Sequence, residues 1–185
     1  KDDVIKLFLT VTDTYGGSHS SEIDRTILNT PPLISDVYIE PSDPVSTSTL
    51  NCFSESYFDD DNDNLTYIYE WVVNGNSISA DEELGPDNFE RGDQVVCRLQ
   101  ANDGVENSSI VNSEAIFVGN AAPTIDDIQI LPANPSVGDV LTTTLIGSND
   151  PEGDEITLHY EWKSYGELLS SEETFDTAQM IPGDS

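Results

Sequence analysis

A repeat of 91 residues is the feature that most restricts how this chain can fold. Trp162 lies 91 positions after Trp71, and Pro123 lies 91 positions after Pro32. Between these anchors the two copies align without a gap, which indicates one structural unit used twice. A chain of 185 residues then holds repeated modules instead of one large domain.

Each copy consists of short alternating segments separated by turns. In the first copy, residues 34–39 and 45–53 predict strands, and an acidic loop then leads into a strand that ends at Trp71. The dipeptide Asn74-Gly75 predicts a hairpin turn directly after it. No segment of useful length has a helical period. Short strands with a turn about every ten residues predict an all-β fold of β-sandwich modules.

The repeat also sets the expected boundaries. An early strand pair, at residues 4–13 and 23–28, recurs later in the chain at residues 94–101 and 113–118. The early pair therefore has the character of the end of a module. Three parts are expected: 1–30 as the C-terminal strands of a preceding module, 31–120 as a complete module, and 121–185 as a module without its last two strands.

Two interpretations of this uneven division remain open. The chain is either a window of a longer tandem array or a subunit that interlocks with its own copies. In the second case, residues 1–30 of one copy complete residues 121–185 of the next by strand addition, giving a head-to-tail fibre. An isolated strand pair is only marginally stable in water, because it has no second layer to cover its apolar face.

The charge of the chain limits its partners. Thirty-six acids against six bases give a formal net charge of -30, which excludes nucleic acid and anionic membrane surfaces as expected partners. The chain is 36% hydrophobic, with these residues spread evenly, so it can still bury cores. No segment approaches the roughly 20 apolar residues of a membrane span, so no membrane insertion is expected.

The acidic loop before each tryptophan strand predicts a calcium site. Its carboxylates alternate through a turn, so their oxygens can converge on one hard cation, whereas zinc would need clustered His or Cys. The alternative is that Asp and Asn only favour turns and keep a sheet edge soluble. The candidate ligands are Asp59, Asp61 and Asp63 in the first copy, and Asp150, Glu152 and Asp154 in the second.

The two cysteines flank Trp71 in the complete copy. Cys52 lies in the second predicted strand and Cys97 in the penultimate one. In a two-sheet sandwich these strands face each other, so a disulfide would close a loop of about 45 residues and stabilise the module by roughly 3–4 kcal/mol. Two buried free thiols are the alternative. Thr143 stands at the position of Cys52 in the second copy.

The order Cys52, Trp71, Cys97 on successive short strands resembles the immunoglobulin fold. The motifs Asn-Asp-Pro-Glu-Gly-Asp-Glu at residues 149–155 and Tyr-Glu-Trp-Val-Val-Asn-Gly at residues 69–75 are similar to tandem immunoglobulin-like modules of large prokaryotic surface proteins. PKD-like and cadherin-like repeats are comparable modules. The resemblance covers the whole chain. It implies an extracellular or cell-surface stalk, fibre, adhesin or envelope layer, and no enzyme.

The resemblance adds one candidate ligand and two classes of function. In this topology the acidic loop and the turn at residues 102–104 lie at the end where the preceding module enters, so Asp103 joins the candidate calcium ligands. The first class is a structural repeat that is stiffened by calcium and contacts neighbouring modules or copies of itself. The alternative is an extracellular module that binds a glycan or protein ligand, which unusual or aromatic loops in one repeat would favour. The loops of both copies are interpreted as generic and acidic, so the structural role is expected first.

Two further patterns concern modification and catalysis. Asn64 and Asn107 each begin a glycosylation acceptor pattern. The only histidines, His19 and His159, lie in a turn and on a predicted strand, and neither has an evident nucleophile or orienting acid. The sequence therefore gives no reason to expect an enzyme.

Overall fold

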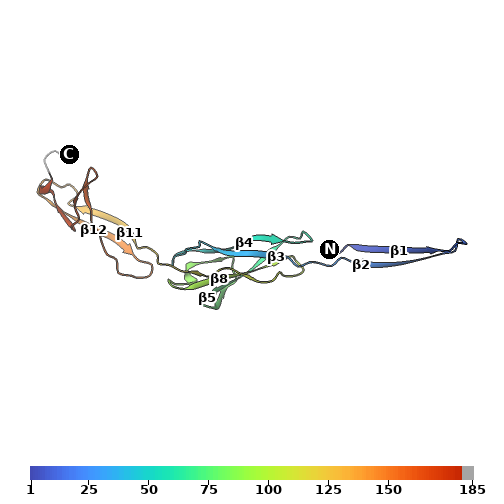
Figure 1. Cartoon of the computed structure of the whole chain (residues 1–185). Coiled ribbons are helices and arrows are strands. Elements are labelled where there is room, and N and C mark those ends of the chain that lie inside the picture. The colour runs from blue at the N-terminus through green and yellow to red at the C-terminus, as the bar shows by residue number, and fades with distance from the viewer. Residues whose placement is uncertain (181–185) are drawn as a thin grey trace. The chain divides into compact units, whose positions relative to one another are not determined.

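The structure is a computed structural model that describes residues 1–180, and these residues form strands, turns and short 3-10 helices (Figure 1). The prediction of an all-β chain is thus confirmed. The chain divides into a unit of residues Lys1–Gly119 and a second unit that begins at Asn120. The last five residues of the predicted 121–185 module fall outside the described part. Within residues 1–180, no helix is long and apolar enough to cross a membrane.

The first unit opens with a hairpin of β1 (Val4–Thr12) and β2 (Ser18–Thr26). The two strands pair in antiparallel register along their whole length. The predicted hairpin is present, but β2 begins at Ser18 and ends at Thr26 instead of covering the predicted residues 23–28. Every residue of both strands is exposed to solvent, although β1 alternates apolar side chains with polar ones over most of its length. The hairpin therefore presents an apolar face that nothing in the first unit covers.

The rest of the first unit contains two antiparallel sheets. The sheet β3-β4-β7 holds the first predicted strand, and the sheet β10-β8-β5-β6, with β9 also paired to β8, holds the tryptophan strand. The strands are β3 (Leu33–Glu40), β4 (Leu50–Phe58), β5 (Thr66–Val73), β6 (Asn76–Ser79), β7 (Glu83–Leu84), β8 (Gln94–Asn102), β9 (Val111–Asn112) and β10 (Ile116–Phe117).

One predicted strand begins later than expected. Residues 45–49 form a turn instead of the start of β4. Two hydrogen bonds between Val45 and Ser48 close this turn. The Ser48 amide donates to the Val45 carbonyl at 2.9 Å, and the Val45 amide donates to the Ser48 hydroxyl at 3.0 Å. Such local bonds of serine compete with strand pairing. The strand continues instead to Phe58.

The core of the first unit lies between its two sheets, as in a β-sandwich. Alternate residues of β8 are buried and face the buried residues of β3 and β4, and the Trp71 side chain is completely buried among them. A disulfide joins Cys52 on β4 to Cys97 on β8, with the two Cα atoms 6.3 Å apart. The bond therefore connects the two sheets through the core.

The chain leaves the first unit next to the turn that precedes β4. Gly119 pairs with Val45 in the parallel sense. The Gly119 amide donates to the Pro44 carbonyl at 2.7 Å, and the Ser46 amide donates to the Gly119 carbonyl at 3.2 Å. The last residues of this unit are thus hydrogen-bonded to the segment between β3 and β4.

The second unit repeats the first half of this arrangement. Its sheet β11-β12-β15 corresponds to β3-β4-β7, and its hairpin β13-β14 corresponds to the turn-linked pair β5-β6. The bounds of β11, β14 and the 3-10 helix η2 (Thr177–Gln179) lie 91 residues after those of β3, β6 and η1 (Pro86–Asn88). The strands are β11 (Thr124–Leu131), β12 (Val140–Asn149), β13 (Trp162–Ser164), β14 (Glu167–Ser170) and β15 (Thr174–Asp176).

The second unit differs where strands β8 and β9 cover the first. Strand β5 pairs with β8 along its full length, whereas residues 157–161, which correspond to its first five residues, are not in a strand. Ile34 on β3 is 8% exposed, and its counterpart Ile125 on β11 is 56% exposed. The sequence that builds a buried sheet in the first unit therefore builds an uncovered one in the second.

Candidate functional site

The acidic loop of the first unit is organised by Asp59. Its Oδ1 accepts hydrogen bonds from the amides of Asp61 at 2.9 Å and Asp63 at 3.1 Å. Its carbonyl accepts one from Asn62, whose φ of 60° places it in the left-handed region. Asparagine and glycine tolerate this conformation better than most residues. The loop is thus held by the aspartate that begins it.

Asp103 approaches this loop from the turn after β8. Its Oδ1 accepts hydrogen bonds from the amides of Val105 and Glu106, both at 2.7 Å, and its Oδ2 accepts one from the Asn29 side chain at 2.9 Å. The hydrogen bond from Glu106, with those from Asn29 and Val105 and the nearby charge of Lys1, lowers the pKa of Asp103 to about 2. The carboxylate is therefore ionised at any neutral pH.

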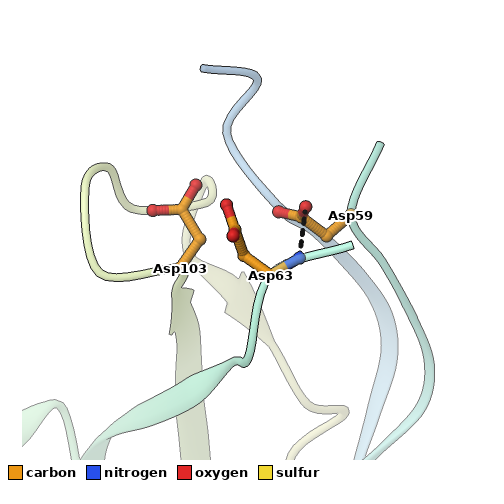
Figure 2. A group of neighbouring side chains, drawn as sticks. All are labelled: Asp59, Asp63 and Asp103. Atoms are coloured by element: carbon orange, nitrogen blue, oxygen red, sulfur yellow. Dashed lines mark hydrogen bonds between the residues drawn. The ribbon is translucent and has the colours of Figure 1, made fainter. Parts of the chain in front are cut away.

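Carboxylate oxygens from Asp59, Asp63 and Asp103 meet at this end of the unit (Figure 2). One oxygen from each lies within 4.8 Å of the other two, and Oδ2 of Asp59 is buried without a hydrogen-bond donor. Oxygens bound to one calcium ion at about 2.4 Å are at most about 5 Å apart. The geometry of these three residues thus fits a single hard cation.

A lysine already lies beside the three carboxylates. The ammonium group of Lys1 forms an ion pair with Asp63 and donates to the Asn29 side-chain oxygen at 3.2 Å. The hydrogen bond to Asp63 raises the pKa of Lys1. A divalent cation at this place would have to compete with that ammonium group for Asp63.

Two of the predicted ligands have a different role. Oδ2 of Asp61 accepts a hydrogen bond from the Thr30 amide at 2.7 Å, which lowers the pKa of Asp61. In the second unit, Oε1 of Glu152 accepts one from the Ala121 amide at 2.9 Å. Thr30 and Ala121 occupy equivalent positions, 91 residues apart, where the chain enters each repeat. Both acids hold the incoming backbone.

The acidic loop of the second unit has the same backbone shape. Oδ1 of Asp150 accepts hydrogen bonds from the amides of Glu152 and Asp154, both at 3.0 Å, and Gly153 has a φ of 77°. Residues 120–180 contain no counterpart of the turn that carries Asp103. Among the described residues, Asp59, Asp63 and Asp103 form the one group of three acids placed to share an ion, and the second loop forms none.

Aromatic side chains next to the first loop were not anticipated as a site. A cavity of about 470 Å³ is lined by Tyr57, Phe58, Tyr67 and residues of the acidic loop. The second copy has Ser148 and Asn149 at the positions of Tyr57 and Phe58. This difference between the two copies is the sequence signal that could have identified the aromatic cavity next to the first acidic loop.

The predicted glycosylation acceptors are both exposed. Asn64 lies at the end of the acidic loop and also lines the aromatic cavity. Asn107 lies in the turn that follows Asp103, and its side-chain oxygen accepts a hydrogen bond from the Asn102 amide group at 2.5 Å. Their exposure is compatible with a glycan, which stays a prediction.

Comparisons with family models, with curated protein sequences and with solved structures find no match to this chain.

Proposed function

We propose that this chain is a non-enzymatic structural repeat of an extracellular stalk, fibre, adhesin or cell-envelope layer. The observation that supports it most is the recurrence of strand bounds at an interval of 91 residues, in register with the sequence repeat. A chain that repeats a whole module, including its turns, extends by adding length. Neighbouring modules or further copies are then its natural partners.

The module we propose is immunoglobulin-like. In the first unit, a three-stranded sheet faces a larger sheet, and the disulfide between Cys52 and Cys97 lies across the core near the buried Trp71. Such an arrangement is characteristic of immunoglobulin domains. Disulfides persist in oxidising compartments, which supports an extracellular or cell-surface location.

We further propose that calcium occupies the group formed by Asp59, Asp63 and Asp103. The support is the spacing of the three oxygens and the buried, unpaired Oδ2 of Asp59. Calcium would supply positive charge among three carboxylates and so join the acidic loop to the turn after β8. Because Asn29 also contacts Asp103, an ion there would stiffen the place where the chain enters the module.

Isothermal titration calorimetry in chelator-treated buffer tests the calcium site. We expect binding heat and a higher melting temperature for the wild-type chain, and loss of both in the double variant Asp63→Asn, Asp103→Asn. Asp60→Asn is the matched control, because Asp60 is an exposed acid of the same loop. Lys1→Ala should bind calcium more tightly, since it removes the competing ammonium group. Absence of heat, with a melting temperature that ignores chelator, would exclude calcium.

A second candidate function is supported by the aromatic cavity. Concave sites with aromatic walls and a few polar groups are typical of ligand pockets. Only one of the two copies carries Tyr57 and Phe58, which a shared structural role does not require. We propose glycan binding as the alternative. A specific hit on a glycan array that Tyr57→Ala and Tyr67→Ala abolish would favour it, and an array without hits would favour the structural role.

A further inference from the structure

We propose that Asn64 carries an N-linked glycan whose first sugars pack on the aromatic wall of the neighbouring cavity. The cavity lined by Tyr57, Phe58 and Tyr67 is then filled by a modification of the same chain. The inference rests on the extracellular location proposed above, because N-linked glycans are typical of secreted proteins. It goes beyond that proposal, since it assigns both a modified residue and the occupant of the cavity.

The acceptor lies on an accessible part of the backbone. Asn64 is exposed and stands at the end of the acidic loop, outside any strand. It begins the pattern Asn64-Leu65-Thr66, in which Thr66 is the exposed first residue of β5. A glycan acceptor has to be reached by the enzyme that modifies it, so it is expected on a surface loop. Asn64 therefore meets the requirement of accessibility.

The cavity is built by the same short segment that carries the acceptor. It has a volume of about 470 Å³, and all of its lining residues, Asn64 among them, fall within residues 57–67. Tyr57 and Phe58 are the last residues of β4, and Tyr67 is the second residue of β5, so the rings come from both sheets. Sugars attached to Asn64 therefore start at the wall of the cavity.

The walls of the cavity suit a sugar. Its aromatic side chains are accessible, with Tyr57 65%, Phe58 57% and Tyr67 37% exposed. Burial, and to a smaller degree the neighbouring Tyr57, raises the pKa of Tyr67, so the two rings lie near each other. An aromatic ring can pack on the apolar C–H face of a sugar. Asp59 and Asn62 line the same cavity and can bond the hydroxyl groups of the sugar.

The second copy lacks both the acceptor and the aromatic wall. Asn64 corresponds to Glu155, which cannot accept an N-linked glycan. The aspartate that holds the loop is kept, as Asp150. Acceptor and rings thus occur together in one copy and are absent together from the other, as expected if the rings serve the glycan. The residues at the three aromatic positions of the second copy are Ser148, Asn149 and Leu158.

Asn107 provides an internal reference. It begins the other acceptor pattern of the first unit and is also exposed, but it is not among the residues that line the aromatic cavity. A glycan on Asn107 would therefore have no contact with the rings. Effects of a glycan as such can be separated in this way from effects of its packing.

Glycopeptide mass spectrometry of the native protein tests the modification. We expect a sugar on the peptide that contains Asn64. In a secretory host that modifies the wild type, Asn64→Gln and Thr66→Ala should lose the sugar, whereas Thr66→Ser should keep it. A native protein without sugar on Asn64 would overturn the proposal and leave the cavity to an external glycan. If that protein contains the intact disulfide between Cys52 and Cys97, the proposed extracellular location would still stand.

Tyrosine nitration tests the packing. The glycosylated chain is compared with Asn64→Gln in chelator-treated buffer, so that no bound cation changes the loop. Tyr57 and Tyr67 should react more slowly in the glycosylated chain, because the sugars cover their rings. Tyr15 and Tyr165, which are 97% and 79% exposed and lie outside the cavity, should react equally in both. Equal reaction of Tyr57 and Tyr67 would place the glycan in solvent and overturn the proposal.

Thermal unfolding separates the contact from the mere presence of a glycan. Asn64→Gln should lower the melting temperature of the first unit by about 4–8 °C, the shift typical of losing one modest contact in a domain of this size. In the background Tyr57→Ser, Tyr67→Leu, which carries residues of the second copy, the same change should have no such effect. Asn107→Gln is the matched control and should leave the melting temperature unchanged. An equal loss in both backgrounds would contradict packing on the rings.

Discussion

The first unit and the second unit carry the same repeat, and the comparison separates what the local sequence determines from what a distant strand determines. In both units a tryptophan indole donates a hydrogen bond to an equivalent backbone carbonyl. Trp71 donates to the Asp81 carbonyl and Trp162 to the Glu172 carbonyl, each at 2.9 Å. The turns that follow are also alike. Yet Trp71 is fully buried, and Trp162 is only half-buried.

The difference shows that the turns are determined by residues close in sequence, whereas the buried core depends on strands distant in sequence. A turn closes with bonds between residues a few positions apart, and it forms wherever its residues occur. A buried sheet needs the second layer, which in the first unit comes from strands far along the chain.

The largest effect is expected when a charge is placed in β8, the strand that packs against β3 and β4 in the core of the first unit. Leu99→Asp should cost more than ~4 kcal/mol and unfold much of the first unit, because the carboxylate would be buried without a partner. Leu9→Asp, at the corresponding exposed position of β1, should change the stability of the monomer by less than ~0.5 kcal/mol. Urea unfolding followed by tryptophan fluorescence at low protein concentration measures both. Similar losses in both variants would show that β1 is already covered.

Removing the disulfide should have the next largest effect. The bond spans 45 residues, so Cys52→Ala, Cys97→Ala should destabilise the first unit by about 3–4 kcal/mol. The second unit, with Thr143 at the position of Cys52, should not change. Hydrogen exchange read by mass spectrometry reports each region separately. Equal loss of protection in residues 120–180 would contradict the independence of the two units.

In chelator-treated buffer, where no calcium is bound, removing the aspartate that begins each acidic loop should have equal effects in the two units. Asp59→Ala and Asp150→Ala each take away the acceptor of two backbone amides. Exchange of the loop amides should speed up about tenfold in either case, which corresponds to about 1.4 kcal/mol. Asp60→Ala is the control. A much larger effect of Asp59→Ala would show that its loop depends on the neighbouring turn.

The smallest effect is a dependence on pH confined to the first unit. Hydrogen bonds lower the pKa of Asp103 from 3.8 to about 2, so its ionised form contributes stability above pH 3.8. That contribution should be lost as the pH falls from about 4 towards 2, and Asp103→Asn should lack this step. NMR titration of the Asp103 carboxyl carbon measures the midpoint. A midpoint near 3.8 would mean that the bonds to Asp103 do not persist in solution.

Much of the fold could be predicted because its signals are local. Alternation of apolar residues located β3, β5 and β8, and Asn74-Gly75 located a hairpin turn that the structure contains. The late start of β4 could not be read from alternation, because the bonds of Ser48 compete with the strand. The open face of the second unit follows from the lack of counterparts of β8 and β9 in residues 120–180. The alignment of the two copies predicted that lack, and local alternation alone could not.

The candidate site was predicted in part for the same reason. Alternating acids indicated that the first loop could gather oxygens, and the resemblance brought Asp103 to them. Asp61 could not be separated from Asp63 by spacing, since the choice depends on the amide of Thr30, which is distant in sequence. Asn29 could have been found, because it recurs as Asn120 in register. The Lys1 ion pair has no such signal.

The parallel contact at Gly119 has a mechanical consequence. Tension that enters the first unit before β3 and leaves at Gly119 pulls the early segment Pro44–Ser46 and the final residues in opposite directions. In a parallel pair this pull slides the strands past each other, so it loads the bonds to Pro44 and from Ser46 together instead of opening them one by one. We therefore expect a module closed in this way to resist stretching better than its thermal stability alone would suggest.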